Sequence, residues 1–359
     1  MRLLALTRYG SLGASSRLRT FQYKSYLEDA GIEVCVHSLL ENEYLDALYS
    51  RRSAWRSVAR GYFLRLRTLL GIAHFDAVLI EKEALPWLPA VVELGLLRRG
   101  TRVVVDYDDA VFHRYDKHHS LLIRVILGQK LDRLMRRADL VIAGNKYLED
   151  RARLAKSPWV EQIPTVVDLD RYPLTNRSSR IREEVVIGWI GSPSTADYLQ
   201  LVSEALKEIG KTFKIRCVAV GARADQLNGT PFEAIDWAED TEVASLQNFD
   251  IGIMPLVDGP WERGKCGYKL VQYMACGLPV IASPVGANVD IVRVGENGLL
   301  AADFAEWTES LAKLIANAEL RVQMGSRGRR QVEEKYCLQI QGPRLAGLLK
   351  KLAGTRIAG

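Results

Sequence analysis

The sequence predicts an α/β protein made of two doubly wound domains, each built around a parallel β-sheet. At 359 residues the chain is too long for one ordinary core. Short apolar runs alternate with longer amphipathic segments, which is typical of strand–helix units. A polar stretch at 174–184 interrupts this alternation, and we place a linker there. We therefore expect domains 1–172 and 173–342 to face a central cleft, with ligands at the carboxyl ends of the strands.

The apolar runs of the first half are predicted to be buried strands. They are Leu3–Thr7, Val34–Ser38, Ala77–Ile80, Arg102–Val105 and Leu140–Ala143. The amphipathic segments Ser16–Ala30 and Leu121–Arg137 are predicted to be helices between them. The first run is too short for the core of a signal peptide, so we interpret it as a strand.

The second half repeats the pattern. Its predicted strands are Val185–Ile190, Ile215–Val220, Ile251–Met254, Pro279–Ala282 and Gly298–Ala301, and the basic tail Gln323–Leu352 is predicted to be helical. No internal repeat of a short fixed period and no low-complexity segment is present. The organisation therefore indicates two similar α/β halves.

Composition and charge narrow the class of protein. Apolar residues make up 48% of the chain and charged residues 26%, which is typical of a folded globular protein. No segment approaches the roughly 20 apolar residues that a membrane-spanning helix needs. The five cysteines are scattered without metal-ligand spacing, so we expect reduced thiols and a cytoplasmic location. Residues 1–172 contain 27 Lys and Arg against 21 Asp and Glu, so this half is expected to face an anionic partner.

The segment Arg51–Gly71 is the most basic part of the first half. It contains six arginines and no acidic residue. At helical spacing an apolar stripe runs along it, made of Trp55, Val58, Tyr62, Leu66 and Leu69. Such a helix can lie on the anionic inner face of a plasma membrane. A helix packed on the core with a solvated basic face is the alternative. A nucleic-acid partner is not expected, because no recognition motif accompanies the charge.

The segment Phe249–Ile291 contains the clearest candidate binding site. A predicted strand leads into a loop with Arg263 and Lys265, and a helix follows Gly267. A glycine at a helix start lets the backbone approach a phosphate, and the unpaired N–H groups there favour an anion. Lys269 and Gln272 lie on one face of that helix. These residues could hold a diphosphate and a ribose hydroxyl, although an ordinary strand–loop–helix unit would also fit.

An acidic cluster follows another apolar strand. Asp106, Asp108, Asp109 and His113 lie within eight residues at the expected carboxyl edge of the first sheet. We expect Asp108 or Asp109 to contact an acceptor hydroxyl or to act as a base, with His113 nearby. A divalent-metal site is one alternative, and a helix cap at Asp109 is another.

The stretch from Lys269 to Gly286 reads KLVQYMACGLPVIASPVG, and Asp290-Ile-Val and Asn297-Gly-Leu-Leu follow it. These motifs resemble the GT-B glycosyltransferases, specifically the large retaining family 4 (glycosyl transferases group 1). The resemblance implies two Rossmann-like domains, donor binding mainly by the second, and a final helix at 343–359 that packs back on the first. It also implies metal-independent transfer without a cofactor.

Two glycine-containing turns fit the same resemblance. Gly13 lies in the turn after the first predicted strand, where it could let the backbone reach the donor. Gly191 and Ser192 occupy the turn after the first strand of the second half, where a basic pair is usual in the family. Hydroxyl and N–H groups would replace that pair.

The family's pair of glutamates is missing. Gln272 stands at the usual ribose-binding glutamate, and Gly264 stands at the other. Glu262 or Asp258 are possible substitutes. We expect a glycosyltransferase that uses a nucleoside-diphosphate sugar and a lipid-linked or saccharide acceptor in surface polysaccharide or glycoconjugate synthesis. The alternatives are a sugar-nucleotide epimerase of the same architecture and an inactive nucleotide-sugar-binding protein.

Overall fold

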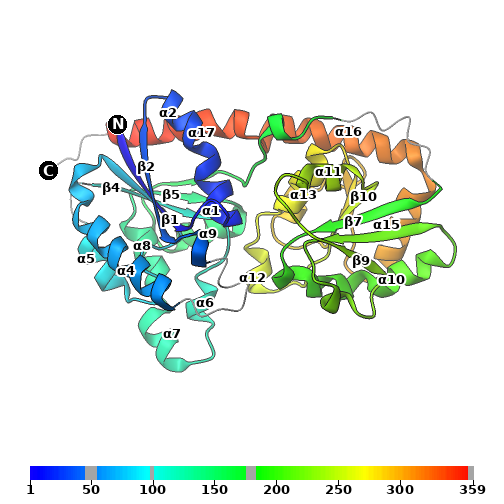
Figure 1. The fold of residues 1–359 in the computed structure, drawn as a ribbon, viewed down its shortest axis with the longest axis horizontal. Coiled ribbons are helices and arrows are strands. Elements are labelled where there is room, and N and C mark those ends of the chain that lie inside the picture. The colour runs from blue at the N-terminus through cyan, green and yellow to red at the C-terminus, as the bar shows by residue number, and fades with distance from the viewer. Residues whose placement is uncertain (45–54, 98–100, 175–182, 355–359) are drawn as a thin grey trace. The chain divides into compact units, whose positions relative to one another are not determined.

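The computed structural model describes residues 1–44, 55–97, 101–174 and 183–354, which form two compact units (Figure 1). The first unit contains Met1–Thr165, Gly264–Cys266 and Leu338–Gly359, and the second contains Val166–Arg263 and Gly267–Cys337. The sequence-based division at residue 172 thus falls within the second unit. Residues 175–182 of the expected linker lie outside the described part of the chain.

The first unit is built on a six-stranded parallel sheet in the order β2-β1-β3-β4-β5-β6. Its strands are β1 (Arg2–Tyr9), β2 (Glu33–Leu40), β3 (Ala77–Glu81), β4 (Arg102–Tyr107), β5 (Leu140–Ala143) and β6 (Val160–Gln162). Five of them match predicted strands. β6 was not predicted, because it has three partly buried residues and no apolar run.

The first unit also contains α-helices, most of which connect these strands. They are α1 (Ala14–Arg19), α2 (Lys24–Asp29), α4 (Trp55–Leu70), α5 (Ala90–Leu96), α6 (His113–Asp116), α7 (Leu121–Leu127), α8 (Lys130–Arg137), α9 (Lys146–Leu154) and α17 (Leu338–Gly354). The last helix, α17, packs on α2 in the first unit, where Gly342 lies against Tyr26. Arg344 at the same helix pairs with Glu161 at 3.0 Å.

Two predicted helices are each divided. Ser16–Ala30 is interrupted at Thr20, whose φ of −130° is not helical, and continues as α2 from Lys24. Leu121–Arg137 is interrupted at Gly128, between α7 and α8. Gly128 itself keeps helical angles, and the next residue, Gln129, with φ of −101° and ψ of 8°, ends the helical path. As a result α7 becomes a separate short helix that projects from the first unit (Figure 1).

The second unit repeats the plan with the strand order β12-β11-β10-β7-β8-β9. Its strands are β7 (Val185–Ile190), β8 (Ile215–Val220), β9 (Phe232–Ile235), β10 (Ile251–Met254), β11 (Val280–Ala282) and β12 (Gly298–Leu300). Its α-helices are α10 (Gln200–Gly210), α11 (Glu242–Gln247), α12 (Pro260–Arg263), α13 (Tyr268–Ala275), α14 (Asn288–Ile291), α15 (Phe304–Ala316) and α16 (Ala318–Lys335).

Both faces of the second sheet are covered. Along β7, Val186 and Ile190 belong to one buried cluster, whereas Ile187 and Trp189 belong to another. Because side chains alternate across a strand, these clusters lie on opposite faces of the sheet. Two parallel sheets with helices on both faces confirm the predicted α/β class, and each sheet offers a carboxyl edge for ligands.

Candidate functional site

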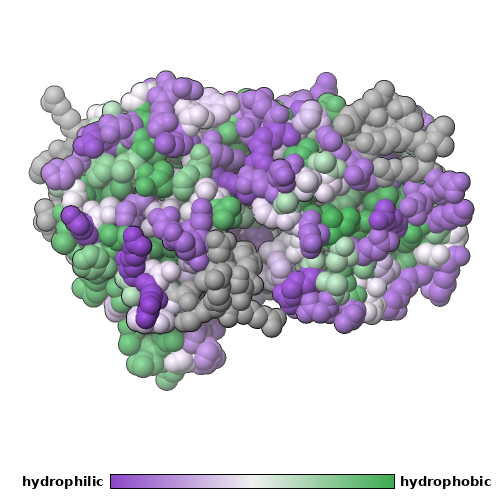
Figure 2. Space-filling model, viewed as in Figure 1, coloured by the Kyte–Doolittle hydropathy of each residue, from purple (hydrophilic) through white to green (hydrophobic). Residues whose placement is uncertain are grey.

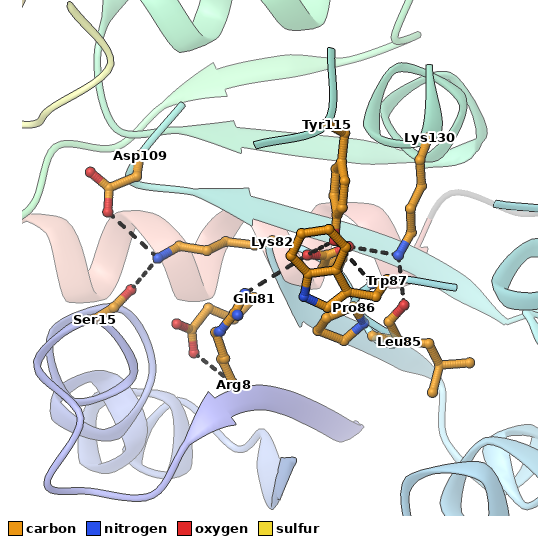
Figure 3. A network of polar contacts seen from close by, with 12 residues as sticks. Arg8, Ser15, Glu81, Lys82, Leu85, Pro86, Trp87, Asp109, Tyr115 and Lys130 are labelled. Atoms are coloured by element: carbon orange, nitrogen blue, oxygen red, sulfur yellow. Dashed lines mark hydrogen bonds and ion pairs between the residues drawn. The ribbon is translucent and has the colours of Figure 1, made fainter. Parts of the chain in front are cut away.

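The acidic edge of the first unit is formed where β3 and β4 end side by side. Glu81 of β3 lies opposite Asp106 of β4 in the parallel ladder, so the residues that follow are neighbours. Lys82 adopts a left-handed backbone with φ of 64°, which non-glycine residues rarely do. Its side chain points toward the loop that holds Asp108 and Asp109 (Figure 3). Backbone strain of this kind commonly marks a functional position.

Lys82 and Ser15 organise the two aspartates. The Lys82 ammonium lies 2.8 Å from Asp108 Oδ1 and 3.7 Å from Asp109 Oδ2, and it donates to Ser15 Oγ at 2.9 Å. Ser15, at the start of α1, donates to Asp108 Oδ2 at 2.6 Å. The side chain of Asp108 is 11% exposed and that of Asp109 is 32% exposed. Asp108 is therefore held in place, and Asp109 is the more accessible carboxylate.

The two carboxylates differ in acidity. Burial tends to raise the pKa of Asp108, but the charges of Lys82 and Arg19 outweigh it and hold that pKa below its ordinary value. Burial and the negative charge of Asp108 raise the pKa of Asp109, although Lys82 and Lys265 oppose the shift. Asp109 is thus the stronger candidate for accepting a proton or a hydroxyl hydrogen bond.

The remaining acidic residues of this edge are tied to structural partners. Arg19 forms a buried bidentate pair with Asp106, with Nε 2.8 Å from Oδ2. Glu81 accepts from Ser16 Oγ at 2.6 Å. Glu83 accepts from Tyr115 and pairs with Lys130 at 2.6 Å. Both carboxylate oxygens of Asp106 are therefore engaged by Arg19.

His113 lies in α6, next to the same edge. One ring nitrogen is 2.8 Å from Asp116 Oδ1 and the other is 2.8 Å from Tyr147 Oη. Both ring nitrogens are engaged, so a role as base would require one of these hydrogen bonds to break. Sequence reasoning placed His113 here but missed Lys82 and Ser15. The signal for Lys82 was its position directly after a predicted strand.

Gly13 caps α1 in the turn after β1. Its N–H donates to Gly10 O at 3.0 Å, and its carbonyl accepts from Arg17 N at 2.9 Å. A Cβ at Gly13 would lie 2.4 Å from Tyr9 Cβ, so the turn requires glycine for space. The turn also brings Ser15 to Asp108.

A lysine and a glycine define the corresponding edge of the second unit. Lys269, at the start of α13, donates to Thr195 Oγ1 at 3.3 Å, and its ammonium lies 4.3 Å from the centre of the Trp189 ring. A Cβ at Gly191 would lie 2.6 Å from the Lys269 ammonium and 2.5 Å from the Trp189 ring. The glycine turn after β7 thus closes directly on the lysine. Ser192 in that turn hydrogen-bonds Ser194 at 2.8 Å.

The start of α13 has the geometry predicted from Gly267. This residue has a φ of 65° and precedes the first turn of the helix. A Cβ there would lie 2.4 Å from Ile291 Cδ1, so no other residue fits without movement. The positive end of the helix dipole and the Lys269 ammonium therefore lie at the same end of α13.

Gln272 lies deeper in the second unit than a ligand contact would suggest. It is 3% exposed and donates to Tyr172 Oη at 3.0 Å. Tyr172 donates in turn to Glu242 at 3.1 Å, and Trp237 Nε1 donates to the same carboxylate at 2.8 Å. Binding of ribose by Gln272 would require this buried chain of hydrogen bonds to rearrange.

The loop before α13 holds its charges in pairs. Arg263 forms a fork with Asp258, with distances of 2.6 and 2.9 Å, and both side chains are about half exposed. Glu262 accepts a short hydrogen bond from Tyr198. Both possible substitutes for the missing glutamate thus already have partners in the second unit.

Gly264 and Lys265 are grouped with the first unit. Asn145 Nδ2 donates to the carbonyls of both, at 2.9 Å each. A Cβ at Gly264 would lie 2.4 Å from Ala110 Cβ and 2.6 Å from Ala110 N. The backbone after the aspartate cluster therefore occupies the space that a glutamate would need, which explains the glycine.

The basic helix α4 has two different sides. Gly61, Arg65 and Leu69 are buried, and Arg65 donates to the carbonyls of Thr7 and His37 at 2.6 and 2.8 Å. The alternative of a core-packed helix thus describes its inner side. Its outer side exposes large apolar and basic residues, namely Trp55, Phe63, Leu70, Arg56, Arg60 and Arg67. Residues 51–54 of this predicted segment lie outside the described residues.

The described residues contain neither a metal-binding cluster nor a membrane-spanning helix. In these ranges no three His, Cys, Asp or Glu side chains are close enough to hold a metal ion. No helix in the same ranges is both long and apolar enough to cross a bilayer.

Comparison with known proteins identifies the class. Residues 184–317 match the family model for Glycosyl transferases group 1. The whole fold is similar to that of Anabaena HepE, solved in complex with UDP, with a TM-score of 0.74 at 16% identity over 98% of this chain and 100% of that one. The fold is therefore the GT-B fold, and the resemblance to glycosyl transferases group 1 is confirmed over residues 184–317; retention stays a prediction.

Curated relatives include two bacterial enzymes. The capsular polysaccharide biosynthesis glycosyltransferase CapM of Staphylococcus aureus is 24% identical over 168 residues, or 45% of this chain and 44% of CapM. The GDP-mannose-dependent α-(1-6)-phosphatidylinositol monomannoside mannosyltransferase of Mycolicibacterium smegmatis is 25% identical over 79% of each chain. The match to CapM thus spans less than half the length of that relative.

Proposed function

We propose that the chain is a retaining glycosyltransferase that moves a sugar from a nucleoside-diphosphate sugar to a lipid-linked or saccharide acceptor. The reaction would serve the synthesis of surface polysaccharide or glycoconjugate. The observation that carries the proposal is the close grouping of Gly191, Thr195 and Lys269 within the family match. The UDP bound to HepE and the names of CapM and the mannosyltransferase support it.

The second unit would bind the donor diphosphate. The Lys269 ammonium and the first N–H groups of α13 would stabilise negative charge on the departing diphosphate. Arg263 would join them by exchanging Asp258 for a phosphate oxygen, since both are bidentate partners of a guanidinium. These cations would fill the role that a divalent metal fills elsewhere. We therefore expect a chelator to leave the transfer rate unchanged.

The first unit would bind the acceptor. Asp109 is the accessible carboxylate with the raised pKa, so it would accept the hydrogen bond of the acceptor hydroxyl. Asp108, fixed by Lys82 and Ser15, would keep Asp109 and its loop in position. Lys82 acts through both carboxylates and is a positioning residue in this scheme.

A panel of UDP-, GDP- and TDP-sugars tests the proposal directly. Incubation with lipid-linked and saccharide acceptors should give a glycosylated product, detected by mass spectrometry, from one donor or a few. Donor interconversion without an acceptor would indicate the epimerase, and donor binding without any product would indicate the inactive binding protein. If no donor binds at millimolar concentration, the nucleotide-sugar assignment fails.

The outer side of α4 would add electrostatic attraction to an anionic membrane. Arg56, Arg60 and Arg67 are exposed there, beside Trp55 and Phe63. This would make the chain a peripheral protein of the inner membrane face. Replacing the three arginines with glutamine should weaken its flotation with anionic vesicles; unchanged flotation would remove α4 from the proposal.

A further inference from the structure

The short helix α7 exposes apolar side chains that a folded protein normally buries. Leu121, Leu122, Val125 and Ile126 are 66%, 67%, 75% and 48% exposed, whereas Leu127 is buried at 5%. Figure 2 shows hydrophobic residues gathered where α7 projects from the first unit. A contiguous exposed apolar surface of this kind commonly marks an interaction site.

Trp87 extends the exposed apolar residues beside α7. Its indole is 46% exposed and makes edge contacts with Tyr115 at 5.3 Å and with His118 at 6.0 Å between ring centres. His118 lies just before α7, and its carbonyl accepts from Arg124 of that helix at 2.6 Å. Trp87 is thus linked to α7 through His118.

The backbone of Trp87 is strained and firmly held. Its φ is 63°, in the left-handed region, and its N–H donates to Tyr115 Oη at 3.0 Å (Figure 3). Tyr115 donates in turn to the buried carboxylate of Glu83, which pairs with Lys130. A buried ion pair therefore fixes a strained residue whose side chain remains in solvent, which indicates a function for the indole rather than packing.

The charge around α7 is positive. Lys130 is buried against Glu83 and Glu93, and the preceding residues 113–129 contain three Lys and Arg and one acidic residue. That acidic residue, Asp116, is already paired with His113 and Arg151. Lys117 and Arg124 are exposed on either side of the N-terminal end of α7. Exposed apolar residues flanked by basic ones, with a tryptophan beside them, are the combination that binds the interface of an anionic bilayer.

We propose that α7 and Trp87 form a membrane-docking surface. The boundary between headgroups and acyl chains takes up the four exposed apolar side chains, namely Leu121, Leu122, Val125 and Ile126. Lys117 and Arg124 contact lipid phosphates. Tryptophan favours the same boundary, because its ring is apolar and its N–H is polar. This inference extends the membrane association proposed for α4 to a second helix of the first unit, and it can be tested without donor or acceptor.

Vesicle flotation of the full chain is the test. Vesicles of phosphatidylcholine with phosphatidylglycerol should bind the protein, and binding should weaken as salt rises. The double variant Leu122→Ser/Val125→Ser should reduce the partition coefficient about tenfold or more, because two inserted apolar side chains are lost. The matched control Leu154→Ser/Val322→Ser removes two other exposed apolar residues and should bind like the wild type.

Three results would overturn the docking surface. The first is a wild type that binds no anionic vesicles, and the second is an α7 variant that binds as well as the wild type. The third is self-association of the wild type, without vesicle binding, that the α7 variant abolishes; this would assign the surface to a second copy of the chain. The α7 variant should bind the donor as tightly as the wild type does. A failure of the nucleotide-sugar assignment can therefore be told apart from a failure of the docking surface.

Discussion

Each of the two sheets has a lysine near its carboxyl edge, and the surroundings of the two lysines differ. Lys82 in the first unit lies against two carboxylates and a serine hydroxyl. Lys269 in the second unit lies against a threonine hydroxyl and the face of a tryptophan. The first arrangement uses the cation to position acids, and the second places the cation beside a hydroxyl and an aromatic ring at the start of a helix. We infer that the first edge organises a base and that the second accepts an anion.

The largest expected effect comes from removing the buried cation of the first unit. Lys82→Met leaves the buried Asp108 carboxylate without its lysine, so the free energy of unfolding should fall by about 3–5 kcal/mol. The transfer rate should also fall about a hundredfold or more, because the acceptor carboxylate is no longer held in place. Chemical denaturation and the transfer assay measure the two effects.

A second variant separates folding from function at that edge. Lys82→Met/Asp108→Asn removes both charges and should recover much of the stability without recovering activity. Stability and activity that return together would mean that Lys82 has only a structural role.

Sequence reasoning found the acids of this edge but not their organisation. The apolar runs before Lys82 and Asp108 predicted strand ends, and that was enough to place charged residues at a carboxyl edge. The pairing could not be predicted, because these residues become neighbours only when β3 lies beside β4. The left-handed backbone at Lys82 also has no glycine to signal it.

The second edge was more predictable, because its signals are local. Gly267 and Lys269 follow one another along the chain, and the structure places both at the start of α13. Gln272 was expected to reach a ribose but is engaged by Tyr172, which is 100 residues away in the sequence. Local spacing thus predicted that Gly267 and Lys269 lie together at the start of α13, whereas long-range hydrogen bonding determined how deep Gln272 lies.

Removing the cation of the second unit should affect binding more than folding. Lys269→Ala should raise the dissociation constant for the donor about tenfold to a hundredfold, the value of one charged hydrogen bond of about 1.5–3 kcal/mol. Titration calorimetry measures it. Lys313→Ala, at an exposed position of α15, is the control and should bind like the wild type. Equal affinities for both variants would contradict the phosphate assignment.

The pH dependence of the transfer rate should reflect the ionisation of Asp109 beside Asp108. Asp109 must be ionised to accept the proton of the acceptor hydroxyl, so the rate should fall as pH drops through its pKa, which lies above the ordinary value of 3.8. Asp108→Asn removes a repulsive negative charge and should move this acidic limb to lower pH. Asp29→Asn, an exposed control, should leave it in place. If Asp108→Asn left the acidic limb of the rate profile unchanged, the charge of Asp108 would not be what raises the pKa of Asp109.

The smallest effect is expected for the exposed ion pair between Asp258 and Arg263, in the loop before α13. Asp258→Asn releases Arg263 for a phosphate, but an exposed ion pair contributes only about 0–1 kcal/mol. Donor affinity should therefore rise no more than about fivefold. Weaker binding by this variant would instead mean that Asp258 itself contacts the donor.

The central claim is that the edge formed by Gly191, Thr195 and Lys269 binds the donor diphosphate. Amide hydrogen exchange of the wild type with and without UDP or GDP tests it most directly. We expect slower exchange at 191–195 and at 267–270 when the preferred nucleotide is bound. Binding of the nucleotide with unchanged exchange in both segments would contradict the account.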